Sequence, residues 1–138
     1  MGTWSGGPLA DDDPGSGTGK GQHLLLVEDD RDLRELMSIL LEEAGYAVTT
    51  ASNGQEALTA LGQGLPDLIL LDLKMPVMNG LEFARLFRAR HARGAPILVV
   101  TAADDPQRRA NEADADGWLG KPFDPEALLA AVRQHLAR

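Results

Sequence analysis

The sequence predicts a doubly wound α/β sandwich in which five parallel strands alternate with five helices. Short apolar runs, of which Leu68–Leu71 is the clearest, recur along the chain and stop at polar residues, proline or glycine. Segments with apolar residues at helical spacing separate these runs. A strand that is apolar at every position is typical of a parallel sheet, because helices cover both of its faces. We therefore expect right-handed crossovers between the strands.

The composition limits the class of protein. The chain has 138 residues, which suits one domain with a substantial core. Its formal net charge of −8 disfavours direct binding to nucleic acid, which requires basic patches. Cysteine is absent, so disulfides and thiolate metal sites are excluded. No apolar run reaches the roughly 20 residues that cross a bilayer, and the N-terminus lacks the pattern of a secretory signal. We therefore expect a cytoplasmic domain that makes no membrane contact.

Residues 1–21 are mostly glycine, serine, proline, threonine and aspartate. Such a segment cannot bury enough apolar surface to offset the entropy lost on ordering, so we predict a flexible tail. Trp4 is an isolated aromatic residue within it, which leaves a docking motif as the alternative. The folded domain is expected to span residues 22–138.

The first half of this domain predicts two strand–helix units before the Leu68–Leu71 strand. His23–Val27 is a strand, and Asp30 is placed to cap the helix that follows it. A second strand covers residues 46–51. The sequence Asn-Gly-Gln-Glu at 53–56 has the form of a capping box at the start of the second helix. The apolar face predicted for the first helix consists of Leu33, Leu36, Met37, Leu40, Leu41 and Ala44.

The second half predicts three further helices and two further strands. A third helix follows Gly80, with Arg85, Arg88 and Arg90 on its outer face. Residues 96–100 form the fourth strand, and residues 105–113 form a short helix with proline in its first turn. Residues 117–120 are a brief fifth strand, after which a last amphipathic helix begins at residues 124–126.

Polar residues follow four of the predicted strands at the point where each strand ends. Glu28 and Asp29 follow the first strand, Asp72 the third, Thr101 the fourth and Lys121 the fifth. Ligands of open α/β sheets bind at the carboxyl ends of the strands, so we expect these side chains to lie together. Neighbouring carboxylates repel one another unless a cation intervenes. Hard oxygen ligands favour Mg²⁺, with Mn²⁺ as the alternative.

The same residues suffice for making and holding an aspartyl phosphate. An aspartate carboxylate can act as a covalent nucleophile toward a phosphoryl group. A divalent cation and Lys121 would neutralise the oxygens of the transferred group, and the hydroxyl of Thr101 could donate to another of them. Asp72 is therefore the predicted chemical centre.

Four motifs, in the same order along the chain, resemble the receiver domain of two-component response regulators. They are Leu-Leu-Leu-Val-Glu-Asp-Asp at 24–30, Leu-Leu-Asp-Leu-Lys-Met-Pro-Val-Met-Asn-Gly at 70–80, Val-Val-Thr-Ala at 99–102 and Gly-Trp-Leu-Gly-Lys-Pro-Phe at 117–123. The resemblance covers residues 23–138. It implies the flavodoxin-like (βα)5 receiver fold, with strand order 2-1-3-4-5. It also implies that a sensor histidine kinase or a histidine phosphotransferase donates the phosphoryl group.

The resemblance implies a role for each acidic residue. Asp72 matches the phosphoacceptor. Asp29, Asp72 and the backbone carbonyl of Lys74 match the metal ligands, and Glu28 would bind the metal directly or through water. The expected cofactor is Mg²⁺.

Further residues match the family's phosphate-binding and switch positions. These are Thr101, Ala102 and Lys121 for the phosphate, Trp118 for the switch aromatic residue, and Pro122 for a cis peptide bond after the lysine. Trp118 also has a purely structural interpretation, as an aromatic residue packed on the last strand. The stretch from Thr101 to Lys121 is shorter than in typical family members, and Asp114 stands where they usually have a glycine. We therefore expect a short or displaced fourth helix.

The leading hypothesis is a stand-alone receiver that signals to an unidentified protein as a monomer or a phosphorylation-dependent dimer. It would have no enzymatic activity beyond self-phosphorylation from small phosphodonors and self-dephosphorylation. One alternative is an interaction module that is never phosphorylated, against which the complete acidic, threonine and lysine set argues. Another is a magnesium phosphohydrolase with an aspartyl intermediate. Those enzymes generally carry a second acid two residues after the nucleophile, where this chain has Lys74.

Overall fold

The structure is a computed structural model, and it describes residues 21–91 and 94–136. Within these ranges, five strands form one parallel sheet with the spatial order β3–β2–β4–β5–β6. Numbered along the chain, this is the predicted order 2-1-3-4-5, so the fold class is confirmed. The elements are β2 (His23–Val27), α1 (Arg31–Glu43), β3 (Ala47–Ala51), α2 (Gly54–Leu61), β4 (Leu68–Leu71), α3 (Gly80–Arg90), β5 (Ile97–Thr101), α4 (Pro106–Glu112), β6 (Gly117–Gly120) and α5 (Pro125–Leu136).

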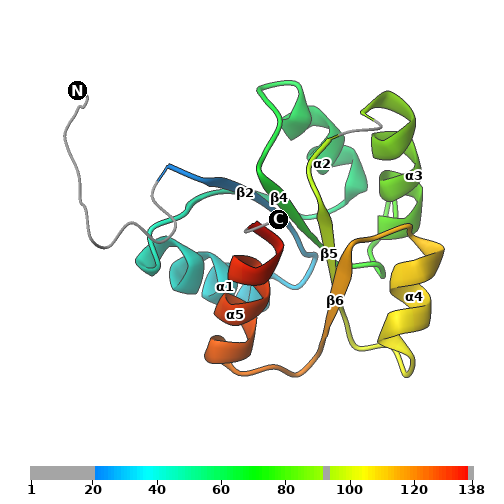
Figure 1. Ribbon diagram of the computed structural model, residues 1–138. Helices are drawn as coiled ribbons and strands as arrows, with labels where there is room; N and C mark the ends of the chain where they lie inside the picture. The colour runs from blue at the N-terminus through cyan, green and yellow to red at the C-terminus, as the bar shows by residue number, and fades with distance from the viewer. Residues whose placement is uncertain (1–20, 92–93, 137–138) are drawn as a thin grey trace.

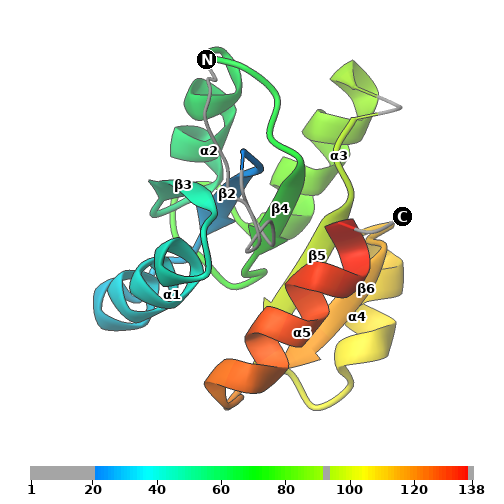
Figure 2. The same cartoon turned by 60° about the vertical axis from the view of Figure 1, so that its left-hand side comes forward.

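Helices α1 and α5 cover one face of the sheet, and α2, α3 and α4 cover the other (Figures 1 and 2). Successive residues of a strand point to opposite faces, so each strand contributes to two cores. On the central strand β4, Leu68 and Leu70 pack in one core, whereas Ile69 and Leu71 pack in the other. All four side chains are fully buried, which explains why this strand is apolar at every position. Asp72 directly follows Leu71, so the buried strand holds it at a fixed place on the edge of the sheet.

The predicted capping box at the start of α2 is only half formed. The side chain of Asn53 accepts a hydrogen bond from the backbone N–H of Glu56, as expected. The carboxylate of Glu56, however, accepts from the backbone N–H and the hydroxyl of Ser52, one residue before the cap. A complete capping box instead begins α3, between Asn79 and Glu82, where none was predicted.

Helices α1 and α4 end with the same hydrogen-bond pattern but with different residues at its critical position. After each helix, two successive backbone N–H groups donate back to carbonyl oxygens of the last turn, which is the Schellman arrangement. The first of these two residues must adopt a left-handed backbone conformation. After α1 it is Gly45, with a φ of 101°, and after α4 it is Asp114, with a φ of 53°. Only glycine adopts such a conformation without steric cost, so Asp114 is a strained end to α4.

Helix α4 has seven residues and is the shortest helix in the described ranges, as the sequence predicts. Asp105 caps it, and Pro106 lies in its first turn, where a missing backbone N–H costs nothing. Two small residues, Ala110 and Ala113, are buried against the sheet. The helix lies beside β6 at the edge of the sheet (Figure 1).

Two predictions about helix faces are wrong. Leu36 was assigned to the buried face of α1, but it is 51% exposed, because the face that contacts the sheet is narrower and centres on Met37 and Leu41. Arg88 was assigned to the outer face of α3. Its guanidinium instead folds toward the sheet, donating to the carbonyl of Ala95 and to the carboxylate of Asp116.

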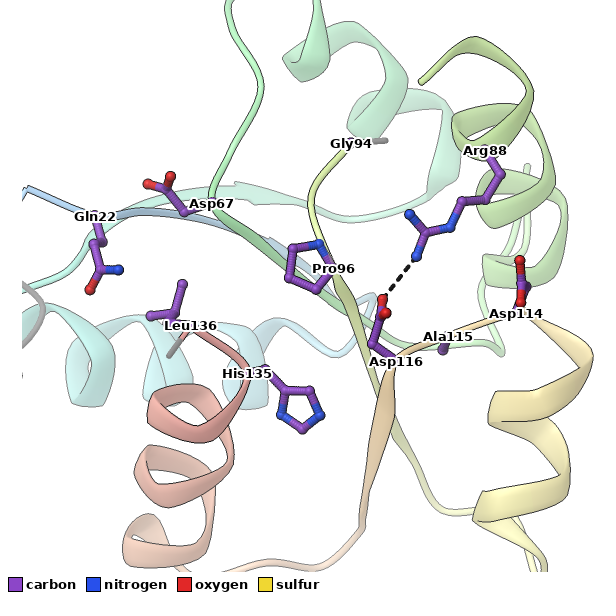
Figure 3. Close-up of a pocket in the computed structure, with 10 residues that line it drawn as sticks. All are labelled: Gln22, Asp67, Arg88, Gly94, Pro96, Asp114, Ala115, Asp116, His135 and Leu136. Atoms are coloured by element: carbon purple, nitrogen blue, oxygen red, sulfur yellow. Dashed lines mark hydrogen bonds and ion pairs between the residues drawn. The ribbon is translucent and has the colours of Figure 1, made fainter. Parts of the chain in front are cut away.

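The ion pair of Arg88 and Asp116 lies at the amino edge of the sheet (Figure 3). An oxygen of Asp116 is 2.9 Å from Nη2 of Arg88 and also accepts from the backbone N–H of Ile97, at 2.8 Å. Asp116 immediately precedes β6, and Ile97 is the first residue of β5. The two strands are therefore fastened together where they begin. An open cavity of about 630 Å³ adjoins this pair, at the end of the sheet opposite to the predicted site.

None of the helices in residues 21–91 and 94–136 has the length and apolar character needed to cross a bilayer. The predicted flexible tail, residues 1–21, lies outside the described residues except for Gly21.

Candidate functional site

Three carboxylates meet at the carboxyl edge of the sheet. Glu28 and Asp29 follow β2, and Asp72 follows β4. These strands are neighbours, and their last residues, Val27 and Leu71, are paired in register. One oxygen from each carboxylate lies within 4.8 Å of the others. Glu28 is 1% exposed and Asp72 is 5% exposed, whereas Asp29 is open to solvent. The structure thus brings together the acidic cluster that the sequence predicts.

Lys121 reaches this cluster from the end of the edge strand β6. It follows β6, and its side chain crosses the end of β5 to the carboxylates that follow β4 and β2. Its Nζ atom is 2.8 Å from Oε1 of Glu28 and 3.7 Å from Oδ2 of Asp72. The cluster therefore contains one ammonium group and three carboxylates.

The environment of Asp72 raises its pKa to about 7, from an ordinary value of 3.8. Burial is the largest cause, followed by the negative charge of Glu28. The ammonium of Lys121 and the backbone N–H of Lys74, which donates to Oδ1 of Asp72 at 3.3 Å, act in the opposite direction. A buried carboxylate that is not fully neutralised by its neighbours is suited to a divalent cation. The donor set, three carboxylates with one oxygen each within 4.8 Å of the others, fits such an ion.

A cavity of about 780 Å³ opens at the acidic cluster, and Thr101 and Ala102 are among the residues that line it. Thr101 is buried at the end of β5, and its Oγ1 atom accepts a hydrogen bond from the backbone N–H of Ala103. Its hydroxyl proton is thus available to another acceptor. Glu28, Asp29, Asp72, Lys74 and Lys121 also line this cavity.

Trp118 and Pro122 lie outside the residues that line the cavity. Trp118 pairs in register with Val99 and is 45% exposed, so its side chain is neither packed in the core nor directed into the cavity. The Lys121–Pro122 peptide bond is cis in the structure.

Arg34 supports the acidic cluster, although it is not among the site residues that the sequence predicts. Its Nη1 atom donates to the backbone carbonyl of Glu28 at 2.8 Å and to that of Asp29 at 3.4 Å. The carboxylate of Glu28 accepts in addition from the backbone N–H of Asp30. Every residue has a backbone carbonyl, so the residue types in the sequence do not show which carbonyls an arginine will contact. Its position one turn after Asp30 on α1 was the only available signal.

Gly80 is a second supporting residue that the sequence analysis did not assign to the site. Its backbone N–H donates to the carbonyl of Leu73 at 3.0 Å. A Cβ atom at this position would overlap the carbonyl oxygen of Asp72 and the Cα atom of Leu73. The loop after β4 therefore folds tightly against the start of α3, and this requires glycine.

The sequence matches the response regulator receiver domain over residues 24–133. The chain is 40% identical over 119 residues to the DNA-binding response regulator MtrA of Mycobacterium tuberculosis, a match that covers 85% of this chain and 51% of that protein. It is 42% identical over 117 residues to the response regulator MprA of Mycolicibacterium vanbaalenii, covering 83% of this chain and 50% of that protein. The chain therefore spans about half the length of the curated relatives it matches.

Solved structures show the same fold. The chemotaxis protein CheY4 of Vibrio cholerae superposes with a TM-score of 0.76 at 37% identity, covering 83% of this chain and 98% of that one. The response regulator TrrA of Thermotoga maritima, solved in complex with Mg²⁺ and BeF, has a TM-score of 0.74 at 34% identity, covering 82% of this chain and 97% of that one. By its sequence match, its fold and its acidic edge, the chain belongs to the receiver domain family of two-component response regulators.

Proposed function

We propose that residues 22–138 accept a phosphoryl group on Asp72 from a sensor histidine kinase or a histidine phosphotransferase. The observation that carries this proposal is the placement of Asp72, a buried carboxylate beside Glu28, Asp29 and Lys121 on the floor of an open cavity. In this proposal Glu28, Asp29, Asp72 and the backbone carbonyl of Lys74 hold Mg²⁺. When bound, the ion neutralises the carboxylates and the oxygens of the transferred group.

The nucleophile is a deprotonated carboxylate oxygen of Asp72. It forms a bond to phosphorus while the bond from phosphorus to the donor's imidazole nitrogen, or to the acyl oxygen of a small donor, breaks. The leaving group retains the electron pair of that bond. Asp72 is buried except where it lines the cavity, so the donor must reach it through that cavity.

Lys121 and Thr101 stabilise the transferred group. The ammonium of Lys121 already lies 3.7 Å from Asp72 and can bind a phosphoryl oxygen attached there. The hydroxyl of Thr101 and the backbone N–H of Ala102 would donate to the remaining oxygens. A movement of Thr101 toward the phosphoryl group would pull on the loop that leads to α4, and Trp118 on β6 would respond to it.

The output of this switch is proposed to be a protein contact in the cytoplasm. We infer that the domain binds a downstream protein as a monomer or as a phosphorylation-dependent dimer, without contacting nucleic acid itself. The formal net charge of −8 supports this, because a DNA-binding surface needs clustered basic residues. No catalytic activity is proposed beyond transfer to and from Asp72.

The test is incubation with acetyl phosphate and Mg²⁺, followed by intact mass spectrometry. We expect a phosphoryl adduct on the native protein and none on Asp72→Asn. Asp32→Asn, which changes an exposed aspartate in the first turn of α1, should be modified like the native protein. Absence of both the adduct and beryllofluoride binding would favour an unphosphorylated module. Steady release of phosphate from many esters would favour a phosphohydrolase.

A further inference from the structure

Helix α4 places two arginines on the wall of the cavity that contains Asp72. Arg108 and Arg109 belong to the first turn and a half of the helix, and both line the cavity together with Lys74 and Lys121. The stretch between Thr101 and the start of α4 is only a few residues long, so the helix begins beside the edge of the sheet. Neither arginine belongs to the four motifs that define the family resemblance.

The two arginines differ in their partners. Nη1 of Arg109 is 2.7 Å from Oε1 of Glu112, one turn further along α4, so part of its charge is already balanced. The backbone N–H of Arg108 donates to the capping carboxylate of Asp105. Within residues 21–91 and 94–136, the guanidinium of Arg108 makes no ion pair and no hydrogen bond. Arg108 is therefore an exposed cation whose five N–H donors are all available.

The charge balance of the cavity makes these cations relevant to the reaction. Its lining contains six carboxylates, namely Glu28, Asp29, Asp30, Asp72, Asp104 and Asp105, against four basic side chains. Every phosphodonor carries an anionic phosphoryl group. Mg²⁺ at the acidic cluster would offset the charge around Asp72, but the exposed carboxylates of Asp104 and Asp105 would still repel that group. Lys121 cannot offset the repulsion at the entrance, because it lies inside the cluster and pairs with Glu28. The cations at the wall that remain accessible are those of Lys74, Arg108 and Arg109.

We propose that Arg108, assisted by Arg109, binds the phosphoryl group of the incoming phosphodonor at the cavity wall before the group reaches Asp72. The inference rests on the proposed phosphorylation of Asp72 and adds a residue that captures the donor. The planar fork of a guanidinium can bind two oxygens of a phosphoryl group at once, which an ammonium cannot. The ligand class is a phosphoryl group on an imidazole nitrogen or on an acyl oxygen.

The test compares Arg108→Gln with Arg85→Gln. Arg85 is an exposed arginine on the outer face of α3, away from the cavity lining, so the two variants carry the same net charge. The rate constant for phosphorylation by acetyl phosphate is measured at low and high ionic strength, and Mg²⁺ affinity is measured by calorimetry. Arg108→Gln should react about threefold to tenfold more slowly at low ionic strength, and the difference should shrink at high ionic strength. Arg85→Gln should react like the native protein.

Mg²⁺ affinity separates capture of the donor from a structural defect. Removing a cation near an acidic metal site should leave Mg²⁺ binding unchanged or make it tighter, in the direction opposite to the phosphorylation rate. Weaker Mg²⁺ binding together with slower phosphorylation would indicate a distorted site and overturn the inference. An unchanged rate in Arg108→Gln, or an equal slowing in Arg85→Gln, would also overturn it. In both cases the native protein still forms the adduct, whereas a native protein without an adduct contradicts the proposed function itself.

Discussion

The Nζ atom of Lys121 lies 2.8 Å from Oε1 of Glu28, about an ångström closer than it lies to Asp72. Its principal partner is therefore the most deeply buried acid of the cluster and not the proposed phosphoacceptor. A phosphoryl group on Asp72 would compete with Glu28 for this ammonium. A cation bound to Glu28 would release Lys121 for the phosphoryl group, so cation binding and phosphoryl binding should support each other.

Replacing Lys121 by methionine should lower the stability of the metal-free protein by about 2 kcal/mol, because it leaves Glu28 buried without a cation. Mg²⁺ should restore much of this loss, since it supplies the missing positive charge. Urea denaturation with and without Mg²⁺ measures both effects. Lys74→Met, at an exposed side chain, is the control and should change stability little. An equal loss in the presence and absence of Mg²⁺ would contradict this account.

Asp72→Asn should make the metal-free protein more stable at pH 8 but not at pH 4. The folded-state pKa of Asp72 is about 7, above its ordinary 3.8, so folding favours the protonated form. The stability that this group contributes is fully present below pH 4 and is lost as the pH rises through 7. The uncharged asparagine avoids that loss, by an amount on the order of 2 kcal/mol at pH 8.

The check is urea denaturation in the presence of a chelator at the two pH values. If Asp72→Asn were less stable than the native protein at pH 8, the prediction would be wrong. Lys121 and the backbone N–H of Lys74 would then stabilise the negative charge of Asp72 more than burial destabilises it. Added Mg²⁺ should reverse the order of the two proteins at pH 8, because only the carboxylate is a good ligand for the ion.

Arg34→Met should weaken Mg²⁺ binding by about tenfold, although Arg34 does not contact the carboxylate oxygens. Its guanidinium holds the backbone carbonyls of Glu28 and Asp29 and thereby fixes the turn that presents their side chains. Calorimetric titration with Mg²⁺ measures the change. Arg31→Met is a matched control, because Arg31 is exposed and, among the residues that the structure describes, pairs only with the side chain of Glu35. Equal affinities for native protein and Arg34→Met would remove Arg34 from the set of positioning residues.

Val77→Gly and Asp114→Gly should each raise stability, by about 0.5–1 kcal/mol. Both residues have positive φ, 68° for Val77 and 53° for Asp114, which costs energy for a residue with a Cβ atom. Val77 is 82% exposed, so glycine removes strain with little loss of packing. Denaturant unfolding provides the measurement. Gly45→Ala, at a φ of 101°, should shift stability in the opposite direction.

The three central strands, β2, β4 and β5, were predictable because they consist largely of consecutive apolar residues that are buried. Leu68–Leu71 has the bounds that the sequence predicts, and the fourth strand differs by one residue at each end, Ile97–Thr101 instead of 96–100. The helix cap Asp30 was also predictable, since a capping side chain acts on a residue three positions away. Asp105, which the sequence places at the start of the fourth helix, caps that helix in the same way. The exposure of Leu36 was not predictable, because a helical repeat does not specify how wide a face of α1 the sheet covers.

The candidate site likewise has features that the sequence predicts and features that it does not. The grouping of Glu28, Asp29, Asp72 and Lys121 follows from strand ends in a parallel sheet, which chain order alone can indicate. The closer approach of Lys121 to Glu28 depends on how its side chain extends from the end of β6, past β5 and β4, to the end of β2. The contacts of Arg34 and Arg88 with backbone carbonyls depend on the backbone path of the loop beside each helix. The residue types at those positions do not indicate that path.

The attachment of Asp116 to Ile97 and Arg88 has a mechanical consequence. It joins β5 and β6 at the end farthest from Asp72, while Thr101 and Lys121 lie at their opposite ends. A pair of strands held at one end can shift at the other only by turning about the held point. We therefore expect a small displacement beside the phosphoryl group to become a rotation of the β6 edge, with Asp116 as its pivot.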